Sequence, residues 1–320
     1  MPRAGFPLRT LPMSGLKGRG AAIRLVGAGR AAAATVRCAA WFAAARPDIV
    51  VGVGGYASGP AVLAGIALRV PTAILEQNHY PGATNRWLAP RVDRVCVPSE
   101  AARRRLGGVG TITGNPVRAA FTRIGPPPAG PALSVLVFGG SRGAHSINVA
   151  MLEALPRLAA VATPPSIVHQ TGADDEAETR DRYRAAYPAD RFEVHAFLDD
   201  MPERLAAADL ALCRAGATTI SELAAAGRPA VLVPYPHAAD DHQRHNAEDV
   251  AACGGAVVIA DRELNGATVA DAILRLASDR PRLAAMGEAA RSLAIPDAGE
   301  RIADVADSLL AGGTEGGRVP

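Results

Sequence analysis

The chain has 320 residues, enough for two domains of ordinary size, each with its own hydrophobic core. Aromatic residues make up only 4% of a sequence that is 49% hydrophobic, so these cores must be built from small aliphatic side chains. The four cysteines form no C-x-x-C pair, which argues against a zinc site and favours reduced thiols in a cytoplasmic protein.

Charge is distributed unevenly along the chain. Residues 1–131 contain 17 Lys and Arg against 4 Asp and Glu, whereas residues 132–320 contain 17 against 27. The basic half should attract anions such as phosphates or an acidic membrane surface. We expect no nucleic-acid partner, because no helix-turn-helix, zinc-finger spacing or basic-aromatic run accompanies this charge. Charged residues interrupt every long apolar stretch and no signal-peptide segment follows Met1, so we expect no membrane-spanning helix.

The first 46 residues predict a loose start followed by a helix over 21–45. From Pro47 onward, short buried strands alternate with helical stretches, which is typical of a parallel sheet in an α/β domain. Such a domain normally opens with a strand and a phosphate-facing loop, but the first credible strand starts near Ile49. We therefore expect a first domain that lacks its leading strand-loop-helix units, through natural shortening or a mis-set start. Strands are expected within 48–55, 71–78, 92–99 and 109–116, with helical segments at 59–68 and 85–89.

A proline- and glycine-rich segment, residues 124–132, is predicted to be a linker. It separates a first domain over 1–123 from a second over 133–296. We also expect a helix at 297–312 that packs back on the first domain, and a disordered tail at 313–320. The fold class is α/β, with two Rossmann-like, doubly wound domains facing a cleft and ligands beyond the carboxyl ends of the strands. Strands of the second domain are expected at 134–138, 166–170, 192–196, 210–214, 230–234 and 256–259.

Two strand-to-helix junctions in the second half are candidate phosphate sites. Residues 137–148, VFGGSRGAHSIN, expose glycine amides at the start of a helix, although they match neither a Walker loop nor the G-x-G-x-x-G spacing. A phosphate role and a simple tight turn are equally open there. In 213–227, CRAGATTISELAAAG, the helix opens at Thr218 and Thr219. The spacing of Thr219 and Glu222 favours a capping box, and the alternative is that this helix start binds a diphosphate while Glu222 holds ribose hydroxyls.

Residues 234–250, PYPHAADDHQRHNAEDV, crowd three histidines and several carboxylates between a strand and a helix. We expect no metal site, because there is no H-E-x-x-H pattern and no distant fourth ligand. A sugar-binding loop is favoured, since the amides of Gln243 and Asn246 can both donate and accept hydrogen bonds.

Three motifs in the first half follow predicted strands and should face the cleft: GVGGYASGP (52–60), EQNHYPGATNRW (76–87) and GNPVR (114–118). Arg118, at the end of the last of these, could reach the second domain or a ligand there. The alternative for Arg118 is an ordinary surface salt bridge.

Taken in order, GGYASGP, EQN, GNPVR, GGSRGA, FLDDM, RAGATTISE, HQRHNA and AIPDA resemble the MurG family from about Gly15 to Gly312. The resemblance implies a GT-B fold and an inverting glycosyltransferase without a cofactor. Such an enzyme moves N-acetylglucosamine from UDP-N-acetylglucosamine to the 4-hydroxyl of lipid I, the undecaprenyl-diphosphate-linked acceptor, and forms lipid II in peptidoglycan synthesis. The alternatives are another GT-B enzyme acting on UDP-N-acetylglucosamine, such as a 2-epimerase or a soluble-acceptor transferase, and a donor-binding remnant without catalysis.

The same resemblance implies the site residues. Ser141 becomes a donor contact, Arg118 the uracil-side contact, and Leu198 the residue whose backbone reads uracil. The helix start from Ala217 to Glu222 becomes the diphosphate and ribose site instead of a mere cap. The implied donor contacts are Asn78, Arg118, Ser141, Leu198, Ala217, Thr218, Thr219, Ile220, Ser221, Glu222, Gln243 and Asn246, and the implied acceptor side consists of Tyr56, Ser58, Glu76 and Asn85.

The chain departs from the family at its start. The family's G-G-T-G-G-H loop, which carries the histidine usually considered for catalysis, has no counterpart here, so we assign no catalytic base, not even His79. The resemblance also implies a peripheral location on the cytoplasmic face of the plasma membrane, through a patch that rests on anionic lipid. The alternative is an ordinary amphipathic surface helix. The expected patch consists of Ile23, Arg24, Leu25, Arg30, Trp41 and Phe42.

Overall fold

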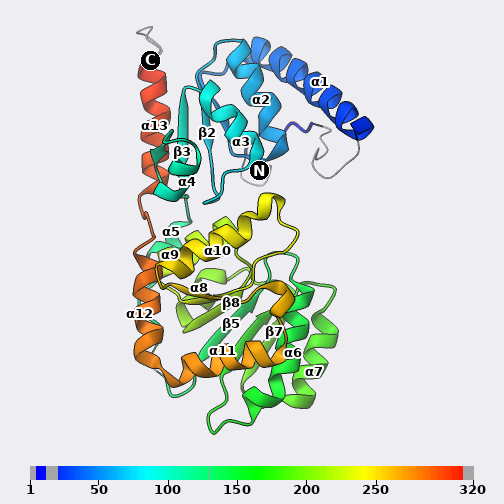
Figure 1. The fold of residues 1–320 in the computed structure, drawn as a ribbon, viewed down its shortest axis with the longest axis vertical. Coiled ribbons are helices and arrows are strands. Elements are labelled where there is room, and N and C mark those ends of the chain that lie inside the picture. Colours follow the sequence, from blue (N-terminus) through cyan, green and yellow to red (C-terminus); the bar gives the residue numbers. More distant parts are fainter. Residues whose placement is uncertain (1–4, 12–20, 129, 313–320) are drawn as a thin grey trace. The chain divides into compact units, whose positions relative to one another are not determined.

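The computed structural model describes residues 5–11, 21–128 and 130–312, without the side chains at 21–25 and 56. The chain forms two compact units: unit 1 is Met1–Gly114 with Gly299–Pro320, and unit 2 is Asn115–Ala298. In each unit, helices pack on a sheet of parallel strands (Figure 1). The predicted α/β class with two sheet-based units is confirmed.

Unit 1 has a four-stranded sheet in the order β1-β2-β3-β4, formed by Val50–Gly52 (β1), Thr72–Leu75 (β2), Arg94–Val97 (β3) and Thr111–Ile112 (β4). Its helices are α1 (Ala21–Ala45), α2 (Gly55–Ala67), α3 (Ala83–Leu88), the short 3-10 helix η2 (Ala89–Arg91), α4 (Glu100–Arg105) and, from Gly299 onward, α13 (Ala298–Gly312).

The helix expected at 59–68 is α2, which begins four residues earlier, at Gly55. Gly54 and Gly55 adopt φ angles of 84° and 73°, which turn the chain from β1 directly into the helix. All four residues of β2 are buried, as in a strand covered on both faces. The core of this unit gathers Val62, Ile74 and Val97 around the sheet.

Unit 2 contains the six strands predicted for the second half. They are Ser134–Phe138 (β5), Ser166–Gln170 (β6), Phe192–His195 (β7), Leu210–Cys213 (β8), Ala230–Leu232 (β9) and Ala256–Val258 (β10). The helices are α5 (Ala119–Thr122), α6 (His145–Ala159), α7 (Glu176–Ala186), α8 (Met201–Ala207), α9 (Ala217–Ala226), η3 (Ala239–Asp241), α10 (His242–Ala252), η4 (Asp261–Glu263), α11 (Gly266–Ser278) and α12 (Arg280–Arg291).

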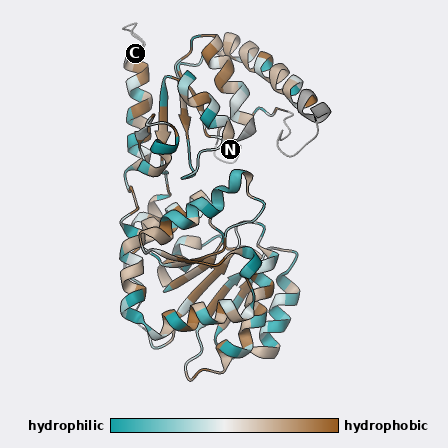
Figure 2. Ribbon diagram, in the orientation of Figure 1, coloured by the Kyte–Doolittle hydropathy of each residue, from teal (hydrophilic) through white to brown (hydrophobic). Residues whose placement is uncertain are grey.

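The sheet of unit 2 has the strand order β10-β9-β8-β5-β6-β7. Its winding therefore reverses between β5 and β8, which are hydrogen-bonded neighbours with Phe138 opposite Cys213. The strands are apolar and the helices around them carry polar residues (Figure 2). At such a reversal the loops leaving the two strands diverge to opposite faces of the sheet, which opens a place for a ligand at the carboxyl edge.

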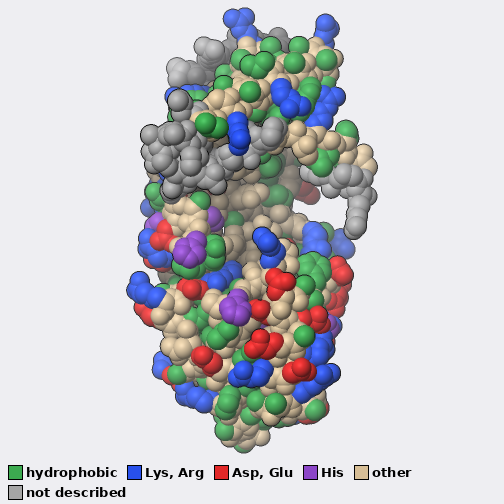
Figure 3. Space-filling model, turned by 90° about the vertical axis from the view of Figure 1, so that its right-hand side faces the viewer, with side chains coloured by type: hydrophobic (Ala, Val, Ile, Leu, Met, Phe, Trp, Pro, Cys, Tyr) green, Lys and Arg blue, Asp and Glu red, His purple; other side chains and the backbone are tan. Residues whose placement is uncertain are grey.

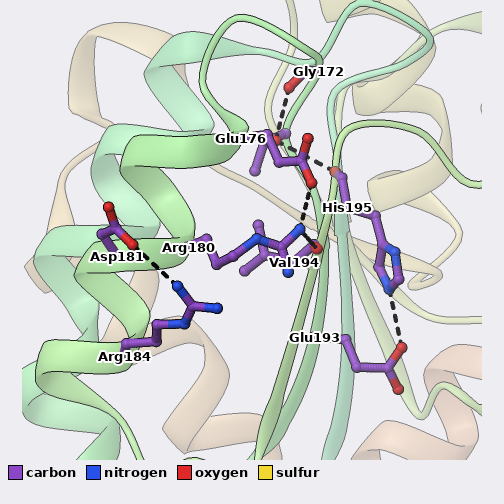
Figure 4. A network of polar contacts seen from close by, with 9 residues as sticks. Gly172, Glu176, Arg180, Asp181, Arg184, Glu193, Val194 and His195 are labelled. Atoms are coloured by element: carbon purple, nitrogen blue, oxygen red, sulfur yellow. Dashed lines mark hydrogen bonds and ion pairs between the residues drawn. The ribbon is translucent and has the colours of Figure 1, made fainter.

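The edge strand β7 is fastened to α7. Arg180 donates to the carbonyl oxygen of Val194 at 2.7 Å and pairs with Glu176 (Figure 4). On the strand itself, Nε2 of His195 lies 3.0 Å from Oε2 of Glu193. Charged groups along an edge keep it from pairing with another chain.

The boundary between the units precedes the expected linker. Phe121 and Ile124 are buried in the core of unit 2 beside α9, and Arg228 and Arg291 donate to the carbonyl oxygens of Gly125 and Ile124 at 2.8 and 3.3 Å. Residues 115–125 therefore belong to unit 2, although we expected the first domain to reach residue 123. Proline and glycine content marks irregular backbone, which here is packed against a helix.

Arg228 should be a major contributor to the stability of unit 2. Its side chain is 1% exposed and its guanidinium donates to four carbonyl oxygens, those of Leu205, Ala206, Ala226 and Gly125. Burial lowers the pKa of Arg228 to about 10. Arg228→Met keeps the apolar stem and removes the guanidinium's hydrogen bonds to all four oxygens, so we expect a loss of about 3 kcal/mol in urea unfolding. Arg282→Met, at an exposed position of α12, should change stability by less than about 0.5 kcal/mol. Equal midpoints for both variants would contradict this assignment.

Candidate functional site

The loop between β5 and α6, residues 139–144, approaches a second backbone very closely. Gly143 has a φ of 74°, and a Cβ atom added to it would lie 1.8 Å from the carbonyl oxygen of Thr171. In the loop that follows β6, a Cβ atom added to Gly172 would lie 2.3 Å from the carbonyl oxygen of Arg142. The two loops thus pack backbone against backbone, which only glycine permits. Ser141, in the same loop, is exposed.

Neither α6 nor α9 has a side-chain cap from the residues that the structure describes. The N-cap of α6 is Ala144 and that of α9 is Gly216. By contrast, Asn265 and Asp279 cap α11 and α12 with their side chains. Because β5 and β8 are adjacent, two uncapped helix starts lie at neighbouring strand ends of one sheet edge. Free N–H groups at the positive end of a helix dipole are suited to an anion.

The capping box predicted from spacing alone for Thr219 and Glu222 is wrong. The helix starts at Ala217, so Thr219 lies inside the first turn and cannot be the N-cap. Within the described chain, the Glu222 carboxylate makes no hydrogen bond. Burial raises the pKa of Glu222, and the nearby positive charge of Arg118 opposes that shift. Glu222 is therefore a partly buried acid whose hydrogen-bonding capacity is unused within the protein.

The segment that follows Gly114 runs beside α9. Asn115 donates to the Ser221 hydroxyl at 3.0 Å, and Ser221 in turn donates to the carbonyl oxygen of Ala217 at 2.9 Å. Arg118 lies with its guanidinium 4.9 Å from the centre of the Phe121 ring. Arg118 thus lies close enough to Glu222 for their charges to interact, and Asn115 contacts the neighbouring Ser221.

Other expected donor contacts lie around this edge in different states of exposure. The side chains of Leu198 and Ile220 are buried in the core, whereas Thr218 is exposed. Gln243 accepts a hydrogen bond from the Tyr235 N–H at 3.0 Å through its side-chain oxygen, which leaves its NH₂ group for another partner. Asn246 is fully buried and donates to the carbonyl oxygen of Ala215 at 3.2 Å. Asn246 therefore fixes the turn after β8 through a buried hydrogen bond.

A second buried amide, Asn148, supports the glycine loop. Its NH₂ group donates to the Thr171 carbonyl at 2.9 Å and to the Asp175 carboxylate at 2.7 Å. The amide oxygen must then accept from Nε2 of the buried His169 at 3.0 Å, and Nδ1 of that ring accepts from the Tyr183 hydroxyl at 3.2 Å. These contacts give every hydrogen-bonding atom of the His169 ring a partner in the neutral form. Sequence reasoning missed Asn148, for which the only signal was its position just after the glycine loop.

In unit 1, the Glu76 carboxylate organises the loop that follows β2. One oxygen accepts from the N–H groups of Gln77 and Asn78 at 2.9 and 2.8 Å, and the other accepts from the Gly82 N–H and the Asn85 amide, both at 2.9 Å. Glu76 is 4% exposed. Of the residues expected on the acceptor side, Glu76 thus shapes the loop rather than facing outward.

Asn85 is the bridge between that loop and β2. Its NH₂ group faces two acceptors, the Leu75 carbonyl and Glu76, so its oxygen points elsewhere and is buried without a partner. Ser58 donates to the carbonyl oxygen of Gly54 at 2.8 Å. Asn78 donates to Glu76 at 3.2 Å, and the side chain of Tyr56 lies outside the described part of the structure.

The surface patch expected on α1 is partly visible. Arg30 is exposed, and Trp41 lies near the guanidinium groups of Arg9 and Arg37, 5.1 and 5.5 Å from its ring centre. Phe42 instead packs against the core of unit 1. Ile23, Arg24 and Leu25 have side chains outside the description. Figure 3 shows Lys and Arg with few acidic neighbours over unit 1, and a mixture of both signs over unit 2.

Two further findings bear on the surface and on metals. Within the described residues, no helix is long and apolar enough to span a bilayer. The same residues contain no group of three or more His, Cys, Asp or Glu side chains that could hold a metal ion.

Known domains and proteins resemble this chain over most of its length. Residues 1–97 match the glycosyltransferase family 28 N-terminal domain and residues 134–307 the C-terminal domain of that family. Two α/β units with these matches define a family 28 glycosyltransferase.

Within that class, the chain belongs to the MurG family. It is 46% identical, over 94% of its length and 84% of the relative, to the UDP-N-acetylglucosamine–N-acetylmuramyl-(pentapeptide) pyrophosphoryl-undecaprenol N-acetylglucosamine transferase of Syntrophotalea carbinolica. The crystal structure of MurG from Acinetobacter baumannii superposes with a TM-score of 0.79 at 30% identity, covering 96% of this chain and 86% of that one. A putative UDP-N-acetylglucosamine 2-epimerase from Listeria monocytogenes, with a TM-score of 0.65 at 16% identity over 91% and 81% of the two chains, shares the fold only.

The buried His169 ring predicts a pH dependence of stability. Burial lowers the pKa of His169 from 6.5 to about 3, so the folded protein resists a proton that the unfolded chain binds. As pH falls from about 6.5 to about 3, the free energy of unfolding should decrease by up to about 1.4 kcal/mol per pH unit from this group. Urea unfolding at several pH values should give a shallower slope for His169→Gln than for the wild type. His237→Gln, at an exposed position, is the matched control and should keep the wild-type slope. Parallel curves for all three proteins would count against a neutral His169.

Proposed function

We propose that this chain transfers N-acetylglucosamine from UDP-N-acetylglucosamine to the 4-hydroxyl of lipid I and so forms lipid II in peptidoglycan synthesis. The 46% identity to the Syntrophotalea carbinolica transferase supports the reaction and both substrates. The structural observation that carries the proposal is the pair of uncapped helix starts at neighbouring strand ends of unit 2. Nucleic acid has no part in this chemistry.

The donor is proposed to bind along this edge of unit 2. Its diphosphate would meet the amides of the 139–144 loop and of Ala217–Thr219, with Ser141 and the two threonines adding hydroxyl donors. Glu222 would accept hydrogen bonds from the ribose hydroxyls, which matches a partly buried carboxylate without a hydrogen bond to the described chain. Arg118 and the Leu198 backbone would contact uracil, the Gln243 NH₂ group would face the sugar, and Asn78 is the contact proposed from unit 1. Ile220 and Ser221 complete the helix start, and Asn246 supports it.

Inverting transfer places two demands on the protein. A base must take the proton of the acceptor hydroxyl as that oxygen attacks C1, and the charge that develops on the departing UDP must be stabilised. The bare amides and hydroxyls at the starts of α6 and α9 meet the second demand. We assign no base to the described residues.

The acceptor is proposed to bind unit 1, at the loops that contain Tyr56, Ser58, Glu76 and Asn85. Glu76 would act by shaping residues 77–82, and the unpartnered Asn85 oxygen gives this region one unused acceptor.

We further propose that α1 rests on anionic lipid at the cytoplasmic face of the plasma membrane. Arg30 and Arg37 are exposed on α1, as are Val26 and Val36 at 55% and 69%, while Ala34 and Cys38 are buried. An exposed surface with both apolar and basic side chains suits a headgroup layer.

The reaction is tested by supplying radiolabelled UDP-N-acetylglucosamine and lipid I in vesicles. We expect the label to partition with the lipid. Donor binding without transfer would instead support a donor-binding remnant, and water-soluble labelled products would support one of the other enzymes.

Glu222 makes donor binding dependent on pH. Hydrogen bonds from ribose hydroxyls favour the ionised carboxylate, whereas burial raises its pKa in the free protein. UDP-N-acetylglucosamine should therefore release protons as it binds and bind more tightly as pH rises through the pKa of Glu222. Calorimetry in buffers of different ionisation enthalpy measures this release. Glu222→Gln should abolish it and weaken binding about tenfold, whereas Glu288→Gln, exposed on α12, should change neither. Unchanged proton release in Glu222→Gln would remove this residue from the donor site.

The membrane contact is tested by reversing two exposed charges on α1. Arg30→Glu with Arg37→Glu should reduce binding to vesicles containing anionic lipid at least tenfold, because each basic residue near such a surface contributes about 1 kcal/mol. Donor affinity should stay unchanged. Arg182→Glu with Arg275→Glu, two exposed positions of unit 2, is the matched control and should bind vesicles like the wild type. Equal vesicle binding by both double variants would remove α1 from the contact.

A further inference from the structure

Arg214 lies at the carboxyl end of β8, immediately before the turn that leads into α9. Its side chain is 12% exposed, and Nη1 lies 2.6 Å from Oδ1 of Asp261, at the start of η4 beyond β10. Nη2 donates to the Ser146 hydroxyl at 2.8 Å, in the first turn of α6. The Ser146 hydroxyl donates to the same Asp261 oxygen at 2.9 Å. The three side chains close a ring of three hydrogen bonds.

This ring also holds the segment after β9. Nη1 of Arg214 lies 3.2 and 3.3 Å from the carbonyl oxygens of Val233 and Pro234, and its guanidinium lies 5.5 Å from the centre of the Tyr235 ring. The Tyr235 N–H in turn donates to Gln243. Four strand ends, those of β5, β8, β9 and β10, are therefore tied together by one guanidinium and one carboxylate.

We propose that Asp261, Arg214 and Ser146 are positioning residues for the sugar diphosphate part of the donor, an inference that rests on the proposed donor site. The ring joins the first turn of α6 to the residue that precedes the turn into α9, so it helps to set the distance between their amides at this edge. It also sets the place of Gln243 through Tyr235. The uracil side, at Arg118 and Leu198, has no hydrogen bond to the ring in the described structure. Loss of the ring should weaken contacts to phosphate and sugar and spare contacts to uracil.

Asp261→Asn is the most direct test, because it removes the charge and keeps the shape. Asp271→Asn is a matched control: Asp271 also pairs with an arginine, Arg157, at 2.6 Å within unit 2, but joins α6 to α11 with both side chains about half exposed. Wild type and both variants are compared by calorimetry with UDP-N-acetylglucosamine, by competition with uridine, and by thermal unfolding. We expect Asp261→Asn to weaken UDP-N-acetylglucosamine about tenfold and to leave uridine within about twofold, because misplaced groups weaken the contacts they should make. The control should bind both ligands like the wild type.

Ser146→Ala and Arg214→Gln extend the test. Ser146→Ala should give the same selectivity with a smaller effect. Arg214→Gln combined with Asp261→Asn should be no weaker a binder than the worse single variant, because both changes break one ring. Equal UDP-N-acetylglucosamine affinity in Asp261→Asn and wild type would overturn the proposal. So would an equal loss for uridine, or a loss that follows the unfolding midpoint across all variants, since both indicate a purely structural role. Failure of the proposed function is distinguished by wild-type protein that does not bind UDP-N-acetylglucosamine at all.

Discussion

The adjacency of β5 and β8 is the constraint on which the proposed site depends. In a parallel sheet, a change in winding direction leaves two neighbouring strands whose following helices pack on opposite faces, so the helix starts at that edge are not covered by a connecting segment. In unit 2 this reversal falls between two strands that are followed by Gly139–Ala144 and by Ala215–Ala217. Both helices therefore direct their first N–H groups toward the same edge.

Within the described chain, the two helices at the switch point begin without a side-chain cap, unlike α11 and α12. α11 begins with a capping box at Asn265 and α12 with the Asp279 carboxylate, whereas α6 and α9 begin at Ala144 and Gly216 without a described side-chain cap. A side-chain cap contributes about 1 kcal/mol to helix stability and occupies the N–H groups that an anion would use. α5, α7, α8 and α10 also begin without a described side-chain cap, so what distinguishes α6 and α9 is their place at the switch point, where a bound diphosphate can supply this stabilisation.

Loops made of glycine and alanine have few side chains with which to hold their own shape. In this protein their shape is imposed by buried polar side chains behind them. Asn148 donates to the Thr171 carbonyl, Asn246 donates to the Ala215 carbonyl, and Arg214 joins Ser146 to Asp261. Glu76 has a similar role in unit 1 for residues 77–82. An unsatisfied buried polar group is costly, so each of these contacts resists displacement and fixes the loop in one conformation.

Sequence reasoning found the strands of unit 2 and both glycine junctions, because local residue patterns indicate buried parallel strands and glycine turns. It failed where an interaction joins distant residues. The role of Asp261 depends on Arg214 and Ser146, which lie 47 and 115 positions away, and no local pattern marks such a partner. Thr219 and Glu222 were misleading for the opposite reason, since their spacing is correct for a capping box but the N-cap is Gly216, three residues before Thr219. Residues 115–123 were assigned to the wrong unit because irregular composition does not reveal which helix a segment packs against.

Three of the four acidic residues in 1–131 make local contacts in unit 1. Glu76 binds amides of its own loop, and Asp93 accepts from the N–H and hydroxyl of Thr72 at 2.8 Å each. Glu100 pairs with Arg103. Residues 1–131 contain 4 acidic against 17 basic residues, and several arginines lie over aromatic rings, as Arg37 does over Trp41 and Arg91 over Trp87. An arginine on an aromatic face keeps its positive charge, because the ring carries no net charge. In unit 2, by contrast, arginines such as Arg157, Arg204 and Arg244 pair with carboxylates. Residues 1–131 therefore carry an excess of positive charge, which supports the proposed contact with anionic lipid.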